Sequence, residues 1–451
     1  MLTYDLKKSP GVPLYEALYR CIRDDILSGV LVPGEKLPSK RALAANLEVS
    51  KITVEGAYSQ LLAEGYIRAQ EKVGYFVELV ERLPKAQPAA CPPRIPESEP
   101  DMVDLTGNGP ARFPFSVWSR LQREVMLDLG EKLLLPLQNQ GCLELRRAIA
   151  AHLAGFRGMA VAPENILIGA GTDFLYNLLI QLLGREKVYA VEDPGYGKIR
   201  RIYAAGGVAC ISAGMDEQGV RVEELNGAQV LHISPSHHFP TGLVTTVDRR
   251  LELLEWAGRG ENRYIIEDDY DSEFRFDAHP KPAMQAMDRN GRVIYMNTFS
   301  KSLAPSIRIS YMVLPDALMT QFQQKLGFYS CTVPSFEQYT LARFLDGGHF
   351  EKHINRMRKY YKLLRNQVIS ALEHSSYADR LTILEQDAGL HFLLQVQTDL
   401  TDAQLVQRCR EAGVRVYALS SFYREERDRH CLVINYSGLR EEDLQRLQGE
   451  A

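Results

Sequence analysis

The sequence lacks the cysteine pattern of a disulfide-rich or zinc-binding protein, because its seven cysteines are scattered, odd in number and never spaced Cys-x-x-Cys. It has no uncharged apolar run near the roughly 18 residues that a membrane helix needs. No apolar signal-peptide segment follows Met1. We therefore expect a cytoplasmic protein with reduced thiols, no metal site and no membrane contact.

An excess of basic charge is also missing. The 451 residues carry a net charge of −4, so no global field draws the whole molecule to nucleic acid. Hydrophobic residues make up 45% and charged residues 24%, which is ordinary globular usage and excludes a disordered or fibrous chain. At roughly 150 residues per domain, the length predicts two or three domains.

Proline is concentrated in one stretch, with six prolines in residues 84–100. Such a stretch favours extended polyproline geometry and predicts a semi-rigid spacer over residues 81–104. A long surface loop within one domain is the alternative. The spacer would separate a small domain, residues 1–80, from a large one, residues 105–451.

Residues 1–80 have the pattern of three helices and a hairpin. Apolar residues recur at helical spacing from Leu14 to Ile26, and Gly29 supplies a stop. Ser39 and Ser50 are N-cap candidates for two further helices. Two short strands follow at residues 66–68 and 75–77. This order predicts a winged helix-turn-helix.

In such a domain the start of the third helix enters the major groove of DNA. That would place Ser50, Lys51 and Thr53 near base edges or phosphates. The start of the second helix, where backbone N–H groups are free, suits a phosphate and carries Ser39, Lys40 and Arg41. Basic and acidic residues balance within residues 1–80, so a protein-interaction module is the alternative.

Three segments, residues 31–44, 49–54 and 62–67, resemble the GntR family of bacterial transcription regulators. The resemblance implies binding to double-stranded promoter DNA. The chain departs from the family at Lys51, where an arginine is usual, and this weakens any bidentate guanine contact. Its wing tip, residues 70–74, lacks the usual glycine-rich, arginine-led form.

After the spacer, short β-rich apolar runs alternate with helical stretches. Continuous runs of this kind are typical of strands buried on both faces of a mostly parallel sheet, so we expect an α/β fold. Ligands of such sheets lie at the carboxyl ends of the strands. The runs are residues 166–168, 188–191, 230–233, 264–266, 293–296 and 307–313.

The residues that follow these strands meet the needs of pyridoxal 5′-phosphate: a lysine for a Schiff base, a carboxylate for the ring nitrogen, an aromatic to cover the ring, and hydroxyls, backbone N–H groups and an arginine for the phosphate. Each residue taken alone is more often structural, and the ordered set carries the prediction. The set is Gly171, Thr172, Tyr196, Asp268, Tyr270, Thr298, Ser300, Lys301 and Arg308.

Residues 105–445 resemble the fold-type I aminotransferases, above all in Thr298-Phe299-Ser300-Lys301 and the carboxylate of Asp268. The resemblance implies that Lys301 forms the Schiff base and Asp268 pairs with the ring nitrogen. It further implies that Tyr270 contacts the phenolate oxygen and that Tyr196 stacks on the ring. The phosphate would be held by Gly171, Thr172, Thr298, Ser300 and Arg308. A small α+β subdomain is expected from about residue 315 to residue 451.

Two departures count against an ordinary aminotransferase. Phe239 stands where the family has an asparagine that touches the phenolate oxygen, and no arginine lies in residues 432–438 to bind an α-carboxylate. Lys198 could supply a looser charge. His237 or His238 could replace the asparagine, and His391 could face the cofactor; packed loop or core histidines are equally open.

The two halves together resemble the MocR subgroup of GntR regulators. This resemblance implies a homodimer with exchanged DNA-binding domains, in which the aminotransferase-like domain is a sensor and not an enzyme. Our hypothesis is that an amine effector, an amino acid or dipeptide, displaces Lys301 by transaldimination and changes promoter binding. The alternatives are a working aminotransferase with an accessory DNA-binding domain, and a sensor of pyridoxal phosphate itself.

Overall fold

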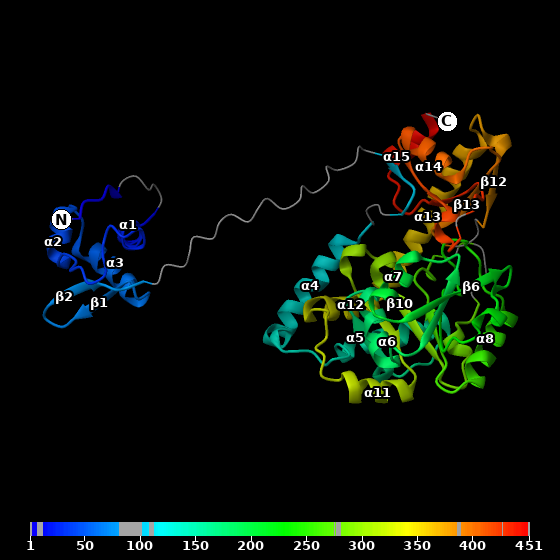
Figure 1. Cartoon of the computed structure of the whole chain (residues 1–451), viewed down its shortest axis with the longest axis horizontal. Helices are drawn as coiled ribbons and strands as arrows, with labels where there is room; N and C mark the ends of the chain where they lie inside the picture. The colour runs from blue at the N-terminus through cyan, green and yellow to red at the C-terminus, as the bar shows by residue number, and fades with distance from the viewer. Residues whose placement is uncertain are drawn as a thin grey trace. The chain divides into compact units, whose positions relative to one another are not determined.

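The computed structural model describes residues 2–6, 12–80, 102–107, 112–274, 276, 281–385, 389–425 and 427–449. The chain forms two compact units, Met1–Ser98 and Glu99–Ala451, each of which is described by itself (Figure 1). Most of the predicted spacer, residues 81–101, lies outside the described residues. Val103 and Asp104, at its end, form strand β3 (Val103–Asp104) of the larger unit.

The smaller unit has the three helices and the hairpin that the sequence predicts. They are α1 (Leu14–Ser28), α2 (Lys40–Asn46), α3 (Lys51–Ala63) and the antiparallel strands β1 (Ile67–Gln70) and β2 (Gly74–Val77). Gly29 ends α1 in the left-handed conformation with φ +81°. Both predicted caps are present, because the Ser39 and Ser50 hydroxyls accept hydrogen bonds from the backbone N–H groups of Ala42 and Thr53.

The larger unit contains an eight-stranded sheet in the order β4-β11-β10-β9-β8-β5-β6-β7. Strand β11 runs antiparallel to both neighbours and β7 antiparallel to β6, while the remaining strands are parallel. The expected mostly parallel sheet is confirmed. The strands are β4 (Ile166–Gly169), β5 (Val188–Asp193), β6 (Ala209–Asp216), β7 (Gly219–Val220), β8 (Val230–Ile233), β9 (Tyr264–Asp268), β10 (Val293–Thr298) and β11 (Ser310–Val313).

The run 307–313 was too long as a strand prediction. Strand β11 begins only at Ser310, and Arg308 lies before it with φ +51°. Its left-handed backbone cannot continue a strand, so the chain turns there. The turn brings the arginine to the end of the sheet, beside the start of a helix.

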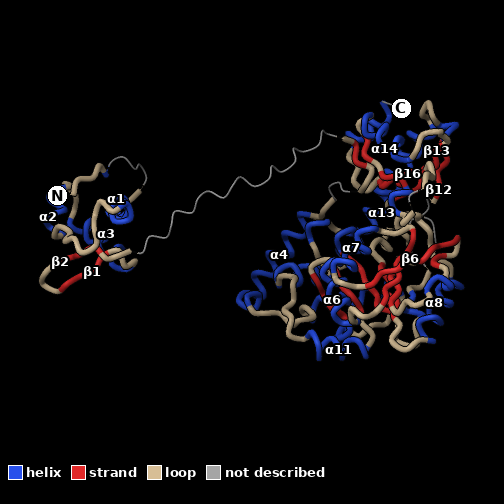
Figure 2. Tube along the Cα trace, in the orientation of Figure 1, coloured by secondary structure: helices blue, strands red, loops and turns tan. Residues whose placement is uncertain are grey.

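Helices cover both faces of this sheet (Figures 1 and 2). On β10, Ile294 and Met296 pack with α6, whereas Tyr295 faces the opposite cluster with α5 and α12. Burial on both faces explains the continuous apolar runs. The helices are α4 (Phe115–Leu129), α5 (Leu143–Arg157), α6 (Thr172–Leu183), α7 (Gly197–Ala205), α8 (Val247–Arg259), α9 (Met284–Met287), α10 (Phe299–Ser302), α11 (Asp316–Leu326), α12 (Ser335–Asp346), α13 (His349–Glu373), α14 (Asp402–Glu411) and α15 (Glu441–Gly449).

A second, antiparallel sheet has the order β12-β13-β16-β15. Its strands are β12 (Leu381–Leu384), β13 (His391–Val396), β16 (Cys431–Asn435) and β15 (Tyr417–Ala418), and β14 (Val414–Arg415) pairs separately with β3. Helix α11 packs against α6, and helix α12 packs against α4 and α5. Residues just after 315 therefore lie with the large sheet, and the second sheet begins at Leu381. No helix among the described residues is long and apolar enough to cross a membrane.

Candidate functional site

Asp268 and Lys301 lie at the carboxyl ends of neighbouring parallel strands. Asp268 is the last residue of β9, and Lys301 lies in the short helix α10 that directly follows β10. The register pairs Asp268 with Met296, so the two strands end side by side. This edge of the sheet is where ligands of such folds bind.

The Asp268 carboxylate is held at one oxygen only. It is 5% exposed; the Tyr176 hydroxyl donates a hydrogen bond to Oδ2, and the Nε2 of His232 lies 3.5 Å from the same oxygen. Oδ1 is buried without a hydrogen-bond partner. A buried carboxylate oxygen without a donor is costly, and the protonated nitrogen of a pyridine ring would satisfy it. Neither Tyr176 nor His232 was found from the sequence.

Lys301 reaches solvent along part of its side chain. Protein atoms around its amine disfavour the charged form and lower its pKa, while the negative charge of Asp271 opposes part of this shift. A lysine whose pKa is lowered has more of the neutral amine that attacks an aldehyde. The environment therefore suits Schiff-base chemistry.

The residues predicted for the phosphate gather at the start of α6. Gly171 has φ +91°, a conformation that favours glycine, and a Cβ at this position would lie 2.3 Å from Nη2 of Arg308 and would displace the guanidinium. The first turn of α6, from Thr172, offers free N–H groups to an anion. The guanidinium of Arg308 lies 3.6 Å from the Asp173 carboxylate.

The hydroxyls at the end of β10 are already engaged in part. Thr298 Oγ1 accepts a hydrogen bond from the backbone N–H of Ser300 (3.1 Å) and lies 2.8 Å from the hydroxyl of Ser310. These bonds fix the turn between β10 and α10. The same turn positions Lys301, so Thr298 has a structural role whether or not it contacts a phosphate.

An aromatic cluster surrounds the predicted ring-stacking residue. Tyr196 is 50% exposed, and its ring meets Phe239 edge to face at 5.8 Å. Phe239 also contacts Phe422 (5.1 Å between ring centroids) and His391 (5.2 Å). Phe239 therefore cannot hydrogen-bond a phenolate oxygen. Phe422 was not predicted, because it lies in a loop of the second sheet.

The predicted effector residues are buried or paired. His237 Nδ1 lies 2.8 Å from Asp271 Oδ2, and the Tyr270 hydroxyl lies 3.3 Å from the same nitrogen. Because an ionised carboxylate only accepts, His237 Nδ1–H donates to Asp271, and the Tyr270 hydroxyl also forms a hydrogen bond with the Asp271 carboxylate. Lys198 is ion-paired with Asp173 at 2.7 Å.

His238 and His391 belong to the same group of buried rings. His391 lies 4.6 Å from the ring of His237, and its Nε2 is 3.1 Å from the Pro240 carbonyl oxygen. Burial lowers the pKa of His391 well below its ordinary value, and burial together with the neighbouring His237 lowers the pKa of His238 to about 3. Both rings are therefore neutral at physiological pH.

Behind the site lies a buried ion pair that the sequence did not reveal. Arg157 Nε is 3.0 Å from Asp269 Oδ2, with side chains 2% and 0% exposed, and its Nη2 donates to the Ser236 hydroxyl (2.9 Å). Burial alone would raise the pKa of Asp269, but the Arg157 charge and hydrogen bonds from Ser236 and Tyr295 lower it. Arg157 is a cation that the acidic run 267–271 requires.

In the smaller unit the predicted DNA contacts differ in availability. Lys51 and Arg41 are exposed at the starts of α3 and α2. Lys40 is ion-paired with Glu55 at 2.7 Å, so part of its charge is already compensated. The Ser50 hydroxyl caps α3 and lies 2.8 Å from the Thr53 hydroxyl.

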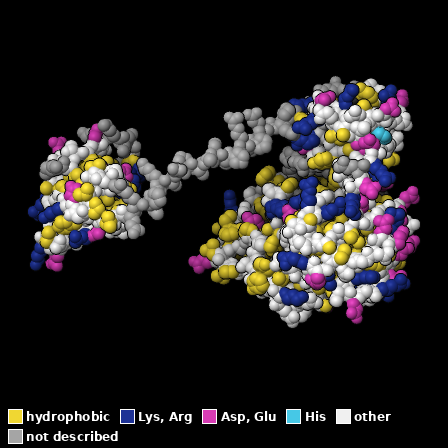
Figure 3. Space-filling model, viewed as in Figure 1, with side chains coloured by type: hydrophobic (Ala, Val, Ile, Leu, Met, Phe, Trp, Pro, Cys, Tyr) yellow, Lys and Arg dark blue, Asp and Glu magenta, His cyan; other side chains and the backbone are white. Residues whose placement is uncertain are grey.

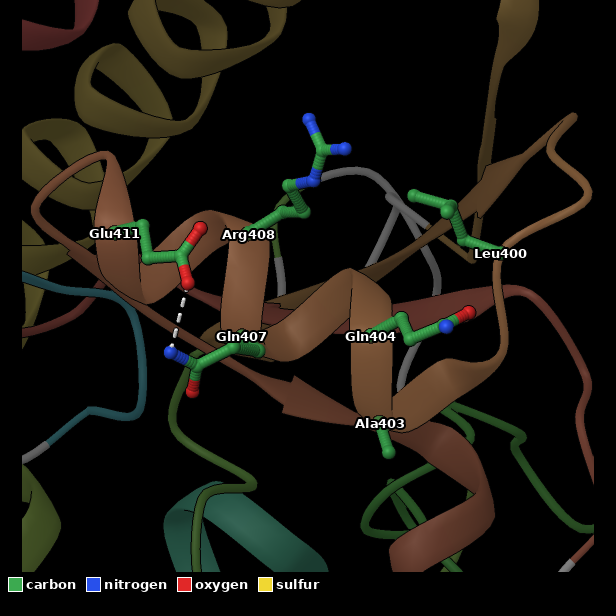
Figure 4. Close-up of a pocket in the computed structure, with 6 residues that line it drawn as sticks. All are labelled: Leu400, Ala403, Gln404, Gln407, Arg408 and Glu411. Atoms are coloured by element: carbon green, nitrogen blue, oxygen red, sulfur yellow. Dashed lines mark hydrogen bonds between the residues drawn. The ribbon is translucent and has the colours of Figure 1, made fainter.

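Other parts of the surface offer little chemistry. A shallow hollow on α14 is lined by Leu400, Ala403, Gln404, Gln407, Arg408 and Glu411 (Figure 4). Its residues include none of those predicted for the cofactor. Within the described residues, no group of three or more histidine, cysteine, aspartate or glutamate side chains could hold a metal ion.

A winged helix-turn-helix unit and an aminotransferase-like α/β unit in one chain define a class of proteins, the transcription regulators with an aminotransferase-like domain. The description "Aminotransferase class I and II" matches residues 100–449, and "Bacterial regulatory proteins, gntR family" matches residues 14–77. The chain belongs to the GntR family of HTH-type regulators with the MocR architecture, and its aminotransferase-like domain is of the pyridoxal phosphate-dependent fold type I.

Relatives of the same architecture span nearly the whole chain. The uncharacterized HTH-type transcriptional regulator YdeL of Bacillus subtilis is 36% identical over 98% of this chain and 97% of its own length. The probable rhizopine catabolism regulatory protein MocR of Rhizobium meliloti is 32% identical over 96% and 92%. Among solved structures, the kynurenine aminotransferase of Pyrococcus horikoshii is 26% identical with a TM-score of 0.68, covering 78% of this chain and 90% of that chain.

Proposed function

We propose that this regulator holds pyridoxal 5′-phosphate on Lys301 and changes its affinity for promoter DNA when an amine effector, an amino acid or dipeptide, displaces that lysine by transaldimination. The observation that carries the proposal is that Lys301, whose pKa is lowered, and Asp268, whose buried Oδ1 lacks a donor, lie at the ends of neighbouring strands. The cofactor supplies an aldehyde that exchanges one amine for another.

The chain's own residues hold the cofactor and leave the amine accessible. Asp268 binds the ring nitrogen and the Tyr270 hydroxyl binds the phenolate oxygen. Tyr196 covers the ring. The phosphate is bound by the first turn of α6, namely Gly171 and Thr172, and by Thr298, Ser300 and Arg308.

The effector is recognised next to this set. Lys198, once released from Asp173, offers a positive charge to an effector carboxylate. His237 and His391 face the effector, and burial keeps the pKa of His391 well below its ordinary value. Because Phe239 replaces the asparagine of aminotransferases, the ring is held less firmly for proton transfer. This favours exchange of amines over repeated transamination.

On DNA, the exposed Lys51 and the half-buried Thr53 of α3 approach the major groove, with Ser50 at the start of the helix. Ser39, Lys40 and Arg41 of α2 contact phosphates. An effector whose binding free energy differs by about 1–3 kcal/mol between two conformations changes promoter affinity about 5- to 150-fold. The protein acts in the cytoplasm, where its promoter lies.

We propose a homodimer with exchanged DNA-binding domains. Several large apolar side chains of the larger unit are exposed around α4 and the segments that follow it, and Figure 3 shows apolar side chains gathered on that part of the surface. An exposed apolar patch of this kind marks an interaction surface. The side chains are Phe115, Leu127, Leu134, Leu135 and Phe328, which are 63–77% exposed.

The test adds pyridoxal phosphate and then a panel of amines to the pure protein, and follows visible absorbance and promoter affinity together. We expect borohydride to attach the cofactor to the peptide that contains Lys301, and one amine class to change both signals. Lys301→Ala should lose the absorbance and the amine response while it still binds DNA. Steady multiple turnovers with a keto acid would show an enzyme instead, and a response to cofactor removal but to no amine would show a cofactor sensor.

A further inference from the structure

A buried row of polar side chains leads away from Asp268. The Nε2 of His232 lies 3.5 Å from Asp268 Oδ2, and the Tyr203 hydroxyl lies 2.6 Å from the other ring nitrogen, Nδ1. Tyr203 is fully buried and His232 is 2% exposed. On its other side, Asp268 Oδ2 accepts the hydroxyl of Tyr176. Side chains of α6 and β8 thus meet at one carboxylate oxygen, and Tyr203 of α7 contacts the β8 histidine from its other side.

The chemistry of the partners fixes the direction of these bonds. An ionised carboxylate only accepts hydrogen bonds, so a buried Nε2 that faces it is stable only when it carries its hydrogen. A neutral imidazole has one N–H, and Nδ1 must then accept the hydrogen of the Tyr203 hydroxyl. Tyr203 therefore selects the tautomer of His232 that presents a donor to Asp268.

The Tyr176 hydroxyl and the His232 ring both face Oδ2 of Asp268, and this affects Oδ1. The hydrogen bond from Tyr176 and the nearby Nε2 of His232, 3.5 Å away, restrict rotation of the carboxylate plane, and Oδ1 stays buried without a partner. Hydrogen bonds to a carboxylate favour its charged form. A charged Asp268 in turn keeps the proton on a pyridine nitrogen that binds Oδ1.

We infer that Tyr203, His232 and Tyr176 are positioning residues which, through Asp268, hold the proton on the ring nitrogen of a bound pyridine cofactor. This inference rests on the proposed function, since Asp268 is the cofactor ligand in that proposal. In this inference the three residues act by orienting Asp268.

The experiment loads the full chain with pyridoxal phosphate labelled with ¹⁵N in the ring and records the nitrogen chemical shift. In the wild-type protein we expect the shift of a protonated pyridine. In Tyr203→Phe and Tyr176→Phe the signal moves toward that of the unprotonated ring. Tyr189→Phe is the matched control, because Tyr189 is equally buried and packs on Tyr203 at 4.7 Å, yet its hydroxyl has no partner.

A second readout does not require the cofactor. In cofactor-free protein labelled at histidine nitrogens, the His232 signals are identified by their loss in His232→Gln. We expect the Nε2–H tautomer in the wild-type protein and in Tyr189→Phe, and a mixture of tautomers in Tyr203→Phe. A wild-type His232 with its hydrogen on Nδ1 alone would overturn the inference.

The outcomes separate the inference from the function beneath it. If the cofactor attaches to Lys301 but its ring nitrogen shift is the same in every variant, the positioning role of Tyr203, His232 and Tyr176 is refuted and the proposed function stands. If the cofactor does not attach to wild-type Lys301, the proposed function fails, and the three positioning residues have no cofactor to act on. If the ring nitrogen signal moves equally in Tyr203→Phe and in Tyr189→Phe, the cause is packing, and the positioning role is refuted.

Discussion

Replacing Arg157 by methionine will leave the negative charge of Asp269 buried without its cation. The two side chains are 2% and 0% exposed and 3.0 Å apart, so water cannot take the place of the guanidinium. Removing one partner of a buried ion pair costs about 3–5 kcal/mol, since the remaining charge has no compensation. We expect the free energy of unfolding of the larger unit to fall by this amount.

The assay is urea denaturation followed by tryptophan fluorescence. The chain has two tryptophans, Trp118 and Trp256, and both lie in the larger unit, so the signal reports that unit alone. Arg146→Met is the matched control. Arg146 lies on the same helix and is also buried, but its partners are neutral oxygens of Gly141, Pro163 and Gln138. Arg146→Met should lower the free energy of unfolding by only about 1–3 kcal/mol.

The pH dependence of the Arg157→Met effect has a definite sign. In the folded protein the pKa of Asp269 is lowered, so its pairing stabilises the fold above the unfolded pKa of about 3.9 and is lost as the pH falls through the folded value. The difference in the free energy of unfolding between wild type and Arg157→Met should be largest at neutral pH and should become smaller in acid. An equal loss in Arg157→Met and Arg146→Met, or a loss under about 1 kcal/mol, would refute this reasoning.

Three further predictions concern DNA binding, the stability of the smaller unit and phosphate binding. Lys51→Ala should weaken promoter binding and reduce the slope of log affinity against log salt by about 1. Lys40→Ala should have a smaller effect, because Lys40 is already ion-paired with Glu55. Fluorescence anisotropy titrations with promoter DNA over a series of salt concentrations measure both effects. Ser50→Ala should destabilise the smaller unit by about 1 kcal/mol through the lost N-cap, as thermal unfolding would show, and an unchanged melting temperature would contradict it. Gly171→Ala should weaken binding of pyridoxal phosphate more than of pyridoxal, because the new Cβ displaces Arg308; equal losses for both ligands would exclude that cause.

The strands that the sequence predicts are those buried on both faces. Strand β9 is fully buried along its length, and its apolar run is visible without the structure. Strand β6 was missed because most of its residues are only partly buried, and its sequence, Ala-Cys-Ile-Ser-Ala-Gly-Met-Asp, has no continuous apolar run. Such a strand near the sheet edge owes its conformation to pairing with β5, which local sequence does not encode.

The same distinction applies to the site. Lys301 and Asp268 could be predicted because they directly follow strands, where topology alone brings residues together. Tyr176, His232 and Arg157 could not. Tyr176 lies among leucines on the buried face of α6, His232 lies inside an apolar strand, and Arg157 is the last residue of α5. Each has the sequence pattern of a core or surface residue, and only the packing of distant elements gives it a partner.

The contacts around Tyr196 connect the cofactor side of the large sheet to the second sheet. The backbone N–H of Gly195 donates to the Phe422 carbonyl (3.0 Å), and the N–H of Arg424 donates to Asp193 (2.9 Å). Phe239 adds ring contacts to both Tyr196 and Phe422. A ligand shifts a conformational equilibrium only by its unequal affinity for the two states. An effector that displaces Tyr196 must alter these contacts, and this gives it one means of moving the second sheet.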